Sequence, residues 1–371
     1  MGLEQSKSKQ LDFLMSEQEQ KIVEKFPLVS VIILNYNGMQ FIDDCLNSVL
    51  KSTYPNYEVI FTDNLSTDES VSHVEKNFPE VKVFQNGVNG GYSLAYNNSF
   101  KVAKGDYYIL LNNDVTVEPN WIEPLVVEAE DDPEVGALQS KLLSMVDNAN
   151  FEYAGAAGGF IDKYGYPFLR GRVFYEMEAD TGQYDDKIDI FWTTGAAMFV
   201  RATVIEECGL LDEDFVHHME EIDWCYRFNL AGYKLRVIPD SIVYHFGGAT
   251  IAPESYKKLY WNHRNSTFML LKCVDKKVFW NIILTKELLD LMSLGWSLSR
   301  LDLKRFWAII AAHWWLLCRP GLIMRKRKEV QKTRKVSDAD LKHLLYPKSV
   351  ALQYFVHGRR TYSKLMEALK K

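Results

Sequence analysis

The first 130 residues alternate between two hydrophobic patterns. Short apolar runs rich in β-branched residues predict buried strands, and segments with apolar residues at helical spacing follow them. Such strand–loop–helix units predict an α/β fold with a doubly wound, mostly parallel sheet. The predicted strands cover 29–34, 57–62, 81–84 and 107–111, and the predicted helices include 41–50 and 92–103.

The pattern changes after about residue 135. Short strand-like runs then mix with glycine-rich loops, and one clear helix is predicted at 219–231. From 256 onward the chain reads as helical, with Trp-rich and Leu-rich stretches at 278–296 and 304–318. The predicted strands of the middle part lie at 136–139, 188–193, 196–200, 234–238 and 242–244.

Polar residues collect where the first strands end. Asn35, Asp63 and Asp114 follow apolar runs, and Asn89 precedes the helix that begins after Gly90-Gly91. In doubly wound sheets ligands bind beyond the carboxyl ends of the strands. We therefore expect these four side chains to converge on one site.

Two acidic segments are candidates for chemistry. In Asn112-Asn113-Asp114 a carboxylate can hold a divalent cation, although Asn and Asp are also common turn residues. In Glu220-Glu221-Ile222-Asp223 the carboxylates suit the dipole of a helix N-terminus, and one of them can also act as a general base. His217 and His218 precede this segment and are candidates for a metal cluster, although the sequence has no HExxH motif. A lone histidine such as His245 is more often structural than a metal ligand.

Several classes of protein are excluded or disfavoured. The sequence has no GxGxxG, GxxxxGK[ST] or GxSxG motif, and its five cysteines form no CxxC pair. The polar start lacks the apolar core of a secretory signal, and the opening Met-Gly-Leu-Glu-Gln-Ser fits a myristoylation pattern that is common by chance. The longest apolar run, 306–318, would extend about 20 Å as a helix, which is too short to span a bilayer.

Seven motifs in order resemble one enzyme family. The chain is similar over about 28–265 to inverting family-2 glycosyltransferases of GT-A fold, with bacterial rhamnosyltransferase-like and galactofuranosyltransferase-like members nearest. The motifs that carry the resemblance are VSVIILNYNG, TDNLSTDES, NGVNGGYSLAYNN, LLNNDV, TTGAAMFVR, LDEDF with MEEIDWCYR, and VYHFGG.

The resemblance implies a nucleotide pocket and a metal site. Asp63 matches the aspartate that binds the pyrimidine base, and Asn35, Asn89 and Asn113 would line the same pocket. Asp114 and His245 would hold Mn²⁺ or Mg²⁺. Because the first two positions of the DxD-like motif are Asn in this chain, Asp114 would be its only carboxylate ligand.

The resemblance also implies a reaction. Glu220 and Glu221 match the acidic pair whose second member is the base, and Trp192, Gly195 and Asp223 would lie around the donor and acceptor sugars. The expected activity is metal-dependent, inverting transfer from a nucleoside-diphosphate sugar, dTDP-rhamnose or a UDP-sugar, to a hydroxyl. The acceptor would be a saccharide or a lipid-linked saccharide in cell-surface polysaccharide assembly.

Two other functions stay open at this point. A sugar-phosphate nucleotidyltransferase shares features of the fold, but the chain lacks a glycine-rich, Lys- or Arg-bearing loop near its start. A non-catalytic module that binds a nucleotide sugar or a partner is the other alternative. The presence of Asp114, Glu221 and His245 together argues against that module.

Charge is distributed unevenly along the chain. Residues 319–371 contain 15 basic and 4 acidic residues, so the rest of the chain must be acidic to give the net charge of -6. Aromatic helices beside a basic segment suit an anionic membrane surface, and no nucleic-acid-binding motif accompanies the charge.

We expect a polar or helical N-terminal extension (1–27), the transferase domain (28–265) and a helical extension (266–371). The expected location is cytoplasmic, peripheral to the inner face of the membrane, with homo-oligomerisation left open.

Overall fold

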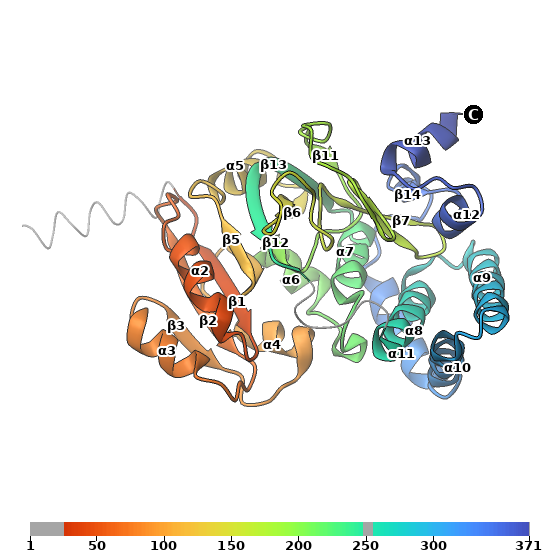
Figure 1. The fold of residues 1–371 in the computed structure, drawn as a ribbon, viewed down its shortest axis with the longest axis horizontal. Helices are drawn as coiled ribbons and strands as arrows, with labels where there is room; N and C mark the ends of the chain where they lie inside the picture. Colours follow the sequence, from red (N-terminus) through yellow and green to blue (C-terminus); the bar gives the residue numbers. More distant parts are fainter. Residues whose placement is uncertain (1–25, 248–254, 371) are drawn as a thin grey trace, which may run out of the picture.

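A nine-stranded sheet forms the centre of the molecule. The computed structural model describes residues 26–247 and 255–370 (Figure 1). Its strand order is β11-β13-β6-β12-β4-β1-β2-β3, with β5 paired to β13. The four strands at one end run parallel, because each returns through a helix. They are β1 (Val29–Asn35), β2 (Tyr57–Asp63), β3 (Lys82–Gln85) and β4 (Tyr107–Asn112).

The second half of this sheet is mixed. β12 lies antiparallel to both β4 and β6, whereas β13 runs parallel to β6. The two strands predicted at 234–238 and 242–244 are one strand, with a register shift between Ile238 and Ile242. The strands of this half are β5 (Val115–Val117), β6 (Val135–Ser144), β11 (Ile188–Asp189), β12 (Ala197–Arg201) and β13 (Lys234–His245).

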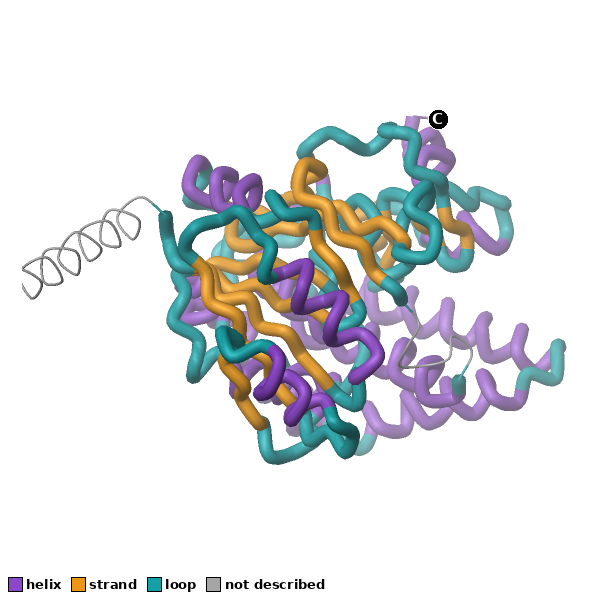
Figure 2. The backbone as a smooth tube through the Cα atoms, turned by 60° about the vertical axis from the view of Figure 1, so that its left-hand side comes forward, coloured by secondary structure: helices purple, strands orange, loops and turns teal. Residues whose placement is uncertain are grey.

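Helices cover both faces of the sheet (Figure 2). Along β1, Val31 and Ile33 pack on one side and Ile32 on the other, so both faces of this strand are apolar. The side of Val31 is covered by α2 (Met39–Val49), α3 (Ser70–Asn77) and α5 (Glu123–Asp131). The other side is covered by α4 (Gly91–Ser99), α6 (Ala202–Cys208) and α7 (Glu220–Leu230). The predicted α/β class and the mostly parallel central sheet are confirmed.

A second, smaller sheet connects the middle of the chain to its end. Its order is β10-β9-β8-β7-β14, and β14 near the C-terminus lies parallel to β7. Asp162 of β7 accepts a hydrogen bond from the backbone N–H of Val350 at 2.8 Å, which fixes the returning segment. The strands are β7 (Gly159–Asp162), β8 (Pro167–Leu169), β9 (Arg172–Val173), β10 (Glu176–Met177) and β14 (Leu345–Tyr346).

The C-terminal part is helical, as predicted. The expected boundary between residues 265 and 266 falls inside α8, and the expected extension 1–27 lies almost wholly outside the described residues. The remaining elements are η1 (Glu213–Phe215), α8 (Tyr256–Cys273), α9 (Phe279–Ser299), α10 (Leu303–Leu317), α11 (Pro320–Thr333), η2 (Asp340–His343), α12 (Val350–Phe355) and α13 (Tyr362–Lys370).

Buried ion pairs join these helices to the body. Lys272 of α8 is almost fully buried and lies 2.5 Å from Asp212 and 2.9 Å from Asp223. Lys326 of α11 contacts Asp212 at 2.8 Å. These cations hold the pKa of the Asp212 carboxyl below its usual value, against the opposing effect of burial. Removing one partner would leave an uncompensated buried charge, so the helices and the body are tightly coupled.

Among the described helices of this part, α9 has 21 residues and α10 has 15. Within residues 26–247 and 255–370, none of the helices taken singly has the length and hydropathy needed to cross a membrane. Together α10 and α11 pass the same test, but they are bent by 74° at the break between them.

Candidate active site

Three of the predicted polar residues form one hydrogen-bonded cluster at the ends of β1, β2 and β4. The Asn35 amide donates to Asp63 Oδ1 at 3.3 Å and to Ser66 Oγ at 3.1 Å, and Asn113 donates to Asn35 Oδ1 at 2.6 Å. A Cβ at Gly38 would lie 1.9 Å from Asn113 Nδ2, so only glycine allows this close approach. The parallel strands therefore bring residues 78 positions apart into contact.

Asn89 joins this region through a residue that the sequence reasoning missed. Asn64 is buried directly after β2, and its backbone N–H donates to the Asn35 carbonyl at 2.8 Å. Its side-chain amide donates to Asn89 Oδ1 at 3.1 Å, and its Oδ1 accepts from Asn86. The adjacent Asp63 was the only available signal for Asn64, because Asn is an ordinary turn residue.

Asp114 and His245 lie side by side although 131 residues separate them. The pairing of β5 with β13 places His245 opposite Val115, and His245 Nε2 then lies 3.1 Å from Asp114 Oδ1. On the other side of the ring, Nδ1 lies 3.1 Å from Glu152 Oε2. Burial alone lowers the pKa of His245, but the two carboxylates outweigh it and raise the pKa to about 10.

Glu152 is a second residue that the sequence reasoning missed. It is buried in the irregular segment after β6, where neither periodicity nor a motif marks it. A Cβ at Gly247 would lie 2.6 Å from Glu152 Oε1, so the chain beyond His245 passes closely over this carboxylate. Glu152 thus lies against the His245 ring on the side opposite Asp114.

The donor set at Asp114 and His245 fits a divalent cation. A carboxylate oxygen and an imidazole nitrogen are both ligands for Mn²⁺, and both side chains are buried. No cluster of three or more such side chains with metal-binding geometry occurs among the residues that the structure describes. A cation here would therefore take two protein ligands and draw its others from substrate or water.

The acidic pair lies at the start of α7, after a turn with unusual backbone angles. Val216, His218 and Met219 have φ values of 66°, 64° and 71°. Non-glycine residues in this conformation cost about 1–3 kcal/mol each and persist only where surrounding contacts hold them. The turn places Glu220 and Glu221 in the first turn of α7, where the helix dipole favours negative charge.

Both carboxyls of the acidic pair have raised pKa values. Burial raises the pKa of the Glu221 carboxyl to about 7, against hydrogen bonds from its own and the next backbone N–H. Burial and the neighbouring charge of Glu221 raise the pKa of Glu220 well above its ordinary value. Glu220 Oε2 has no hydrogen-bond partner within the described part of the chain. One carboxyl that titrates near neutrality beside one that stays protonated suits a general base with a neutral neighbour.

The two halves of the site meet at α4. A Cβ at Gly91 would lie 3.0 Å from the Val216 carbonyl, so the start of α4 abuts the strained turn. Tyr92 packs on Tyr96 with ring centroids 4.6 Å apart. Burial is the main cause of the raised pKa of both phenols; Glu221 adds to it at Tyr92, and Asp114 adds to it at Tyr96. The acidic pair and Asp114 therefore both act electrostatically on this tyrosine pair.

A fully buried residue of α8 holds the strained turn. The Asn265 amide donates to the carbonyls of Phe215, His217 and His218 at 3.0, 2.8 and 2.7 Å. This residue lay at the predicted end of the transferase region, with no motif to mark it. Its contacts make Asn265 a positioning residue for the carboxylates that follow the turn.

We expect Asn265→Ala to lower kcat about 10–100-fold through displacement of Glu221, with little change in the KM for the donor. The variant removes one donor from the carbonyls of Phe215, His217 and His218, and the Phe215 carbonyl keeps its hydrogen bond from Arg264. The free energy of unfolding should therefore fall by about 1–3 kcal/mol. Steady-state kinetics and urea unfolding measure the two effects.

Asn229→Ala is the matched control for this prediction. The Asn229 amide also donates to two carbonyls, those of Phe191 and Cys225, both at 2.8 Å, but at the far end of α7. It should lose similar stability and keep kcat. Equal losses of kcat in both variants would contradict the positioning role of Asn265.

Other predicted residues lie in packed surroundings. Trp192 is buried and donates from its indole to the Phe160 carbonyl at 2.9 Å, while the Gly195 carbonyl accepts from Tyr92 at 2.9 Å. Asp223 is fully buried against Lys272 and Arg227, with no surface for a sugar, so it acts on the site only through α7.

The histidines before the acidic pair lie in other surroundings. His217 packs against Trp261, with ring centroids 4.9 Å apart. Burial and the charge of Lys258 lower the pKa of His218 to about 4. In the described ranges, neither histidine belongs to a group of metal-ligating side chains.

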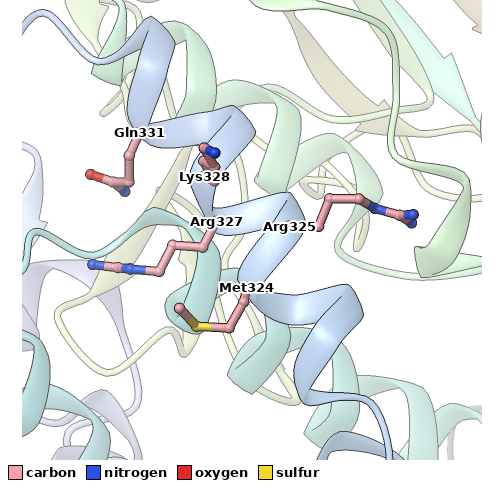
Figure 3. Close-up of a pocket in the computed structure, with 5 residues that line it drawn as sticks. All are labelled: Met324, Arg325, Arg327, Lys328 and Gln331. Atoms are coloured by element: carbon pink, nitrogen blue, oxygen red, sulfur yellow. The ribbon is translucent and has the colours of Figure 1, made fainter.

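The hollow in Figure 3 is a separate feature. It is an open depression of about 540 Å³ on α11, lined by Met324, Arg325, Arg327, Lys328 and Gln331. None of the predicted site residues lines it, so its basic and apolar surface belongs to the helical part of the molecule.

Comparisons with known proteins identify the family of the chain. The family model described as glycosyl transferase family 2 matches residues 30–207. An uncharacterized glycosyltransferase of Haemophilus influenzae is 34% identical over 34% of this chain and 40% of its own length. Glycosyltransferase GlyG of Streptococcus pneumoniae is 33% identical over 58% of this chain and 69% of its own. An N-acetylglucosaminyl-diphospho-decaprenol L-rhamnosyltransferase of Mycobacterium tuberculosis is 23% identical over 66% and 84%.

A solved structure shares the fold. The crystal structure of GalNAc-T7 with UDP, GalNAc and Mn²⁺ superposes with a TM-score of 0.53 and 21% identity, over 69% of this chain and 50% of that one. The family model and the similarity to GlyG confirm the resemblance seen in the motifs. The chain belongs to glycosyl transferase family 2 and is a glycosyltransferase.

Proposed function

We propose that this enzyme transfers a sugar from a nucleoside-diphosphate donor to an acceptor hydroxyl with inversion, and that Glu221 is the general base. The observation that carries the proposal is the Glu221 carboxyl at the start of α7, whose pKa is raised to about 7, together with the tyrosine pair of α4 on which both Glu221 and Asp114 act electrostatically. A base that titrates near the working pH combines the correct protonation state with enough driving force for proton transfer.

The donor nucleotide would bind the polar cluster at the strand ends. Asp63 and Asn35 would contact the base, and Asn89 and Asn113 would line the pocket around it. Support comes from the hydrogen bonds that fix these side chains before any ligand arrives, since preorganisation lowers the cost of binding. dTDP-rhamnose is the first candidate donor, because one relative is named a rhamnosyltransferase, and UDP-sugars are the second.

Asp114 and His245 would hold the divalent cation, Mn²⁺ or Mg²⁺. Bound there, the cation would neutralise the charge that develops on the departing diphosphate. Glu152 would keep the His245 ring oriented toward Asp114, as the 3.1 Å contacts on its two nitrogens indicate.

The reaction is one displacement. Glu221 takes the proton of the acceptor hydroxyl while its oxygen attacks the anomeric carbon on the face opposite the diphosphate. The bond from that carbon to the diphosphate oxygen breaks, and the electron pair leaves with the nucleoside diphosphate. The protonated neighbour Glu220 adds no charge that would repel the donor. Because the new bond forms on the face of the anomeric carbon opposite the bond that breaks, the anomeric configuration inverts.

The acceptor would be a saccharide or a lipid-linked saccharide in cell-surface polysaccharide assembly. The enzyme would work in the cytoplasm at the inner face of the membrane. In this arrangement the region 28–265 provides the chemistry and the helices beyond it position the enzyme, while their buried ion pairs keep the two parts together.

A donor panel tests the proposal. Thermal shift with dTDP-rhamnose, UDP-glucose and UDP-N-acetylglucosamine, each with and without Mn²⁺, should show stabilisation by one donor, larger with the cation. A donor at a hundredfold excess over its Kd adds about 2.7 kcal/mol. Stabilisation only by a nucleoside triphosphate with pyrophosphate release would favour a nucleotidyltransferase. Donor binding without turnover would favour a non-catalytic module.

A further inference from the structure

Helix α9 buries a charged pair on its inner side, together with Ile283 and Leu289, and exposes apolar residues on its outer side. Lys286 and Asp290 point inward and are buried, with Lys286 Nζ 2.5 Å from Asp290 Oδ2. His263 of α8 lies 3.1 Å from Asp290 Oδ1, so the inner charges are paired. Trp280 and Leu284 point outward and are 69% and 63% exposed. A surface helix in water normally buries its apolar stripe.

Helix α10 exposes a continuous apolar stripe. Its outward residues recur at intervals of three and four, which places them on one helix face. The side that packs inward consists of small and aliphatic residues, including Ala308 and Ala312. The exposed stripe comprises Leu303, Trp307, Ile310, Trp314 and Leu317.

The turn between these helices is apolar too. Leu301 is 80% exposed, with a φ of 56°, and Leu298 before it is also exposed. We call α9, α10 and this turn the α9–α10 hairpin. Figure 1 shows it at the edge of the molecule, away from β1, β2 and β3. Exposed apolar surface on this scale marks an interaction site in soluble proteins.

Basic residues border the apolar surface. Residues 276–328 contain eleven Lys and Arg against three Asp and Glu. Arg300 and Lys304 are exposed at the turn, and Arg325 and Lys328 are exposed at the hollow on α11 (Figure 3). The partner that fits this surface is therefore apolar in its interior and anionic at its rim.

We propose that the α9–α10 hairpin lies in the interface of an anionic lipid bilayer, with its Trp and Leu side chains among the lipids and its basic residues at the headgroups. Tryptophan favours this depth because its ring is apolar and its N–H is polar. A second copy of the chain fits less well, since an isologous contact would bring the same basic rims together.

Docking by this surface places the strained turn before Glu220 and Glu221 near the bilayer. Helix α8, which carries Asn265, packs against α10, and Arg264 lies over the Trp315 ring at 4.7 Å. The same Arg264 donates to the carbonyls of Asp214 and Phe215 before the turn. The surface itself is independent of catalysis, but its use in reaching a lipid-linked acceptor rests on the proposed function.

Vesicle binding tests the docking surface with the full chain. Flotation with phosphatidylcholine vesicles containing 30% phosphatidylglycerol should recover the protein, and vesicles of phosphatidylcholine alone should recover much less. Brominated lipids should quench the tryptophan emission of the bound protein. The double variant Trp307→Ser/Trp314→Ser should lower the partition coefficient about tenfold or more. Both rings are exposed, so the variant should remain folded.

The control substitutes exposed apolar residues on the body. Val127→Ser/Val146→Ser removes side chains that are 57% and 75% exposed and should leave vesicle binding unchanged. Equal binding by the Trp double variant overturns the proposal. The proposal is also overturned if the wild-type protein never floats and instead forms a dimer in analytical ultracentrifugation that the Trp double variant abolishes. Donor binding by thermal shift should be unchanged in the Trp variant, so failure of the catalytic proposal and failure of docking are separate results.

Discussion

Glu221→Gln is expected to reduce sugar transfer by about 10²–10⁴-fold, the range attributed to a positioned general base. Glutamine keeps the shape of the side chain but cannot accept the proton of the acceptor hydroxyl. Because the substitution leaves the nucleotide cluster and the Asp114–His245 pair intact, donor binding should be preserved. Initial rates with the donor identified by thermal shift, together with the donor Kd, measure both parts.

The pH dependence of wild type should report the same group. Burial raises the pKa of Glu221 to about 7, so the carboxylate form, which is the active base, is lost as pH falls through 7. The rate should therefore rise with pH on a limb near 7, and residual activity of Glu221→Gln should lack that limb. The sign for stability is opposite: because the folded pKa is raised from 4.5 to about 7, this carboxyl makes the fold less stable as pH rises from about 4.5 to 7, and the loss is complete above 7. Glu221→Gln should thus be at least as stable as wild type at pH 8.

Glu220→Gln is the matched control within the same helix turn. Glu220 is held protonated by burial and by the charge of Glu221, so a neutral amide resembles its resting form. This variant should lose much less activity than Glu221→Gln. If Glu221→Gln keeps near-wild-type turnover while Glu220→Gln does not, the two roles are reversed.

Asp114→Ala is expected to lower transfer about 10²–10³-fold and to abolish the stabilisation by Mn²⁺. The substitution removes the single carboxylate of the NND motif and one of the two carboxylates that raise the pKa of His245. Manganese binding, followed by the loss of its free EPR signal during titration, gives a readout independent of activity.

Glu152→Gln should weaken metal binding less than Asp114→Ala does. It keeps the packing around His245 but removes the negative charge 3.1 Å from Nδ1. Loss of such an outer partner typically weakens metal affinity about 10–100-fold, less than removal of a ligand. Unchanged Mn²⁺ binding in Asp114→Ala would rule out the proposed ligand, and urea unfolding of both variants separates this result from loss of the fold.

The sequence predicts the elements of the α/β core because its signals are local. β-branched runs of four to seven residues specify strands whether or not their neighbours are known, and the polar residues at their ends follow from strand direction. The motif order also identified the family. The NND and MEEID motifs named Asp114 and Glu221, and the pairing of β5 with β13 supplies the contact between Asp114 and His245.

The residues that hold these side chains in place were not predictable in the same way. Asn265 and Glu152 act through contacts with residues about 48 and 93 positions away. Neither belongs to a local pattern, because a buried hydrogen bond between distant segments leaves no periodicity in the chain. Asp223 also depends on a distant contact: its motif suggested the sugar region, and in the structure a buried lysine of α8 engages its carboxylate.

The C-terminal helices separate the two kinds of information most clearly. Sequence alone determined that 278–318 forms apolar, Trp-rich helices beside a basic segment, since composition and helical spacing are local properties. Only the tertiary structure decided which face points outward. Lys286 is buried because Asp290 is within its reach and His263 contacts that carboxylate, and this pairing turns Leu284 and Trp280 toward the surface. Helical spacing defines the faces of a helix, but the partners across the packed interface determine which of them is the inside.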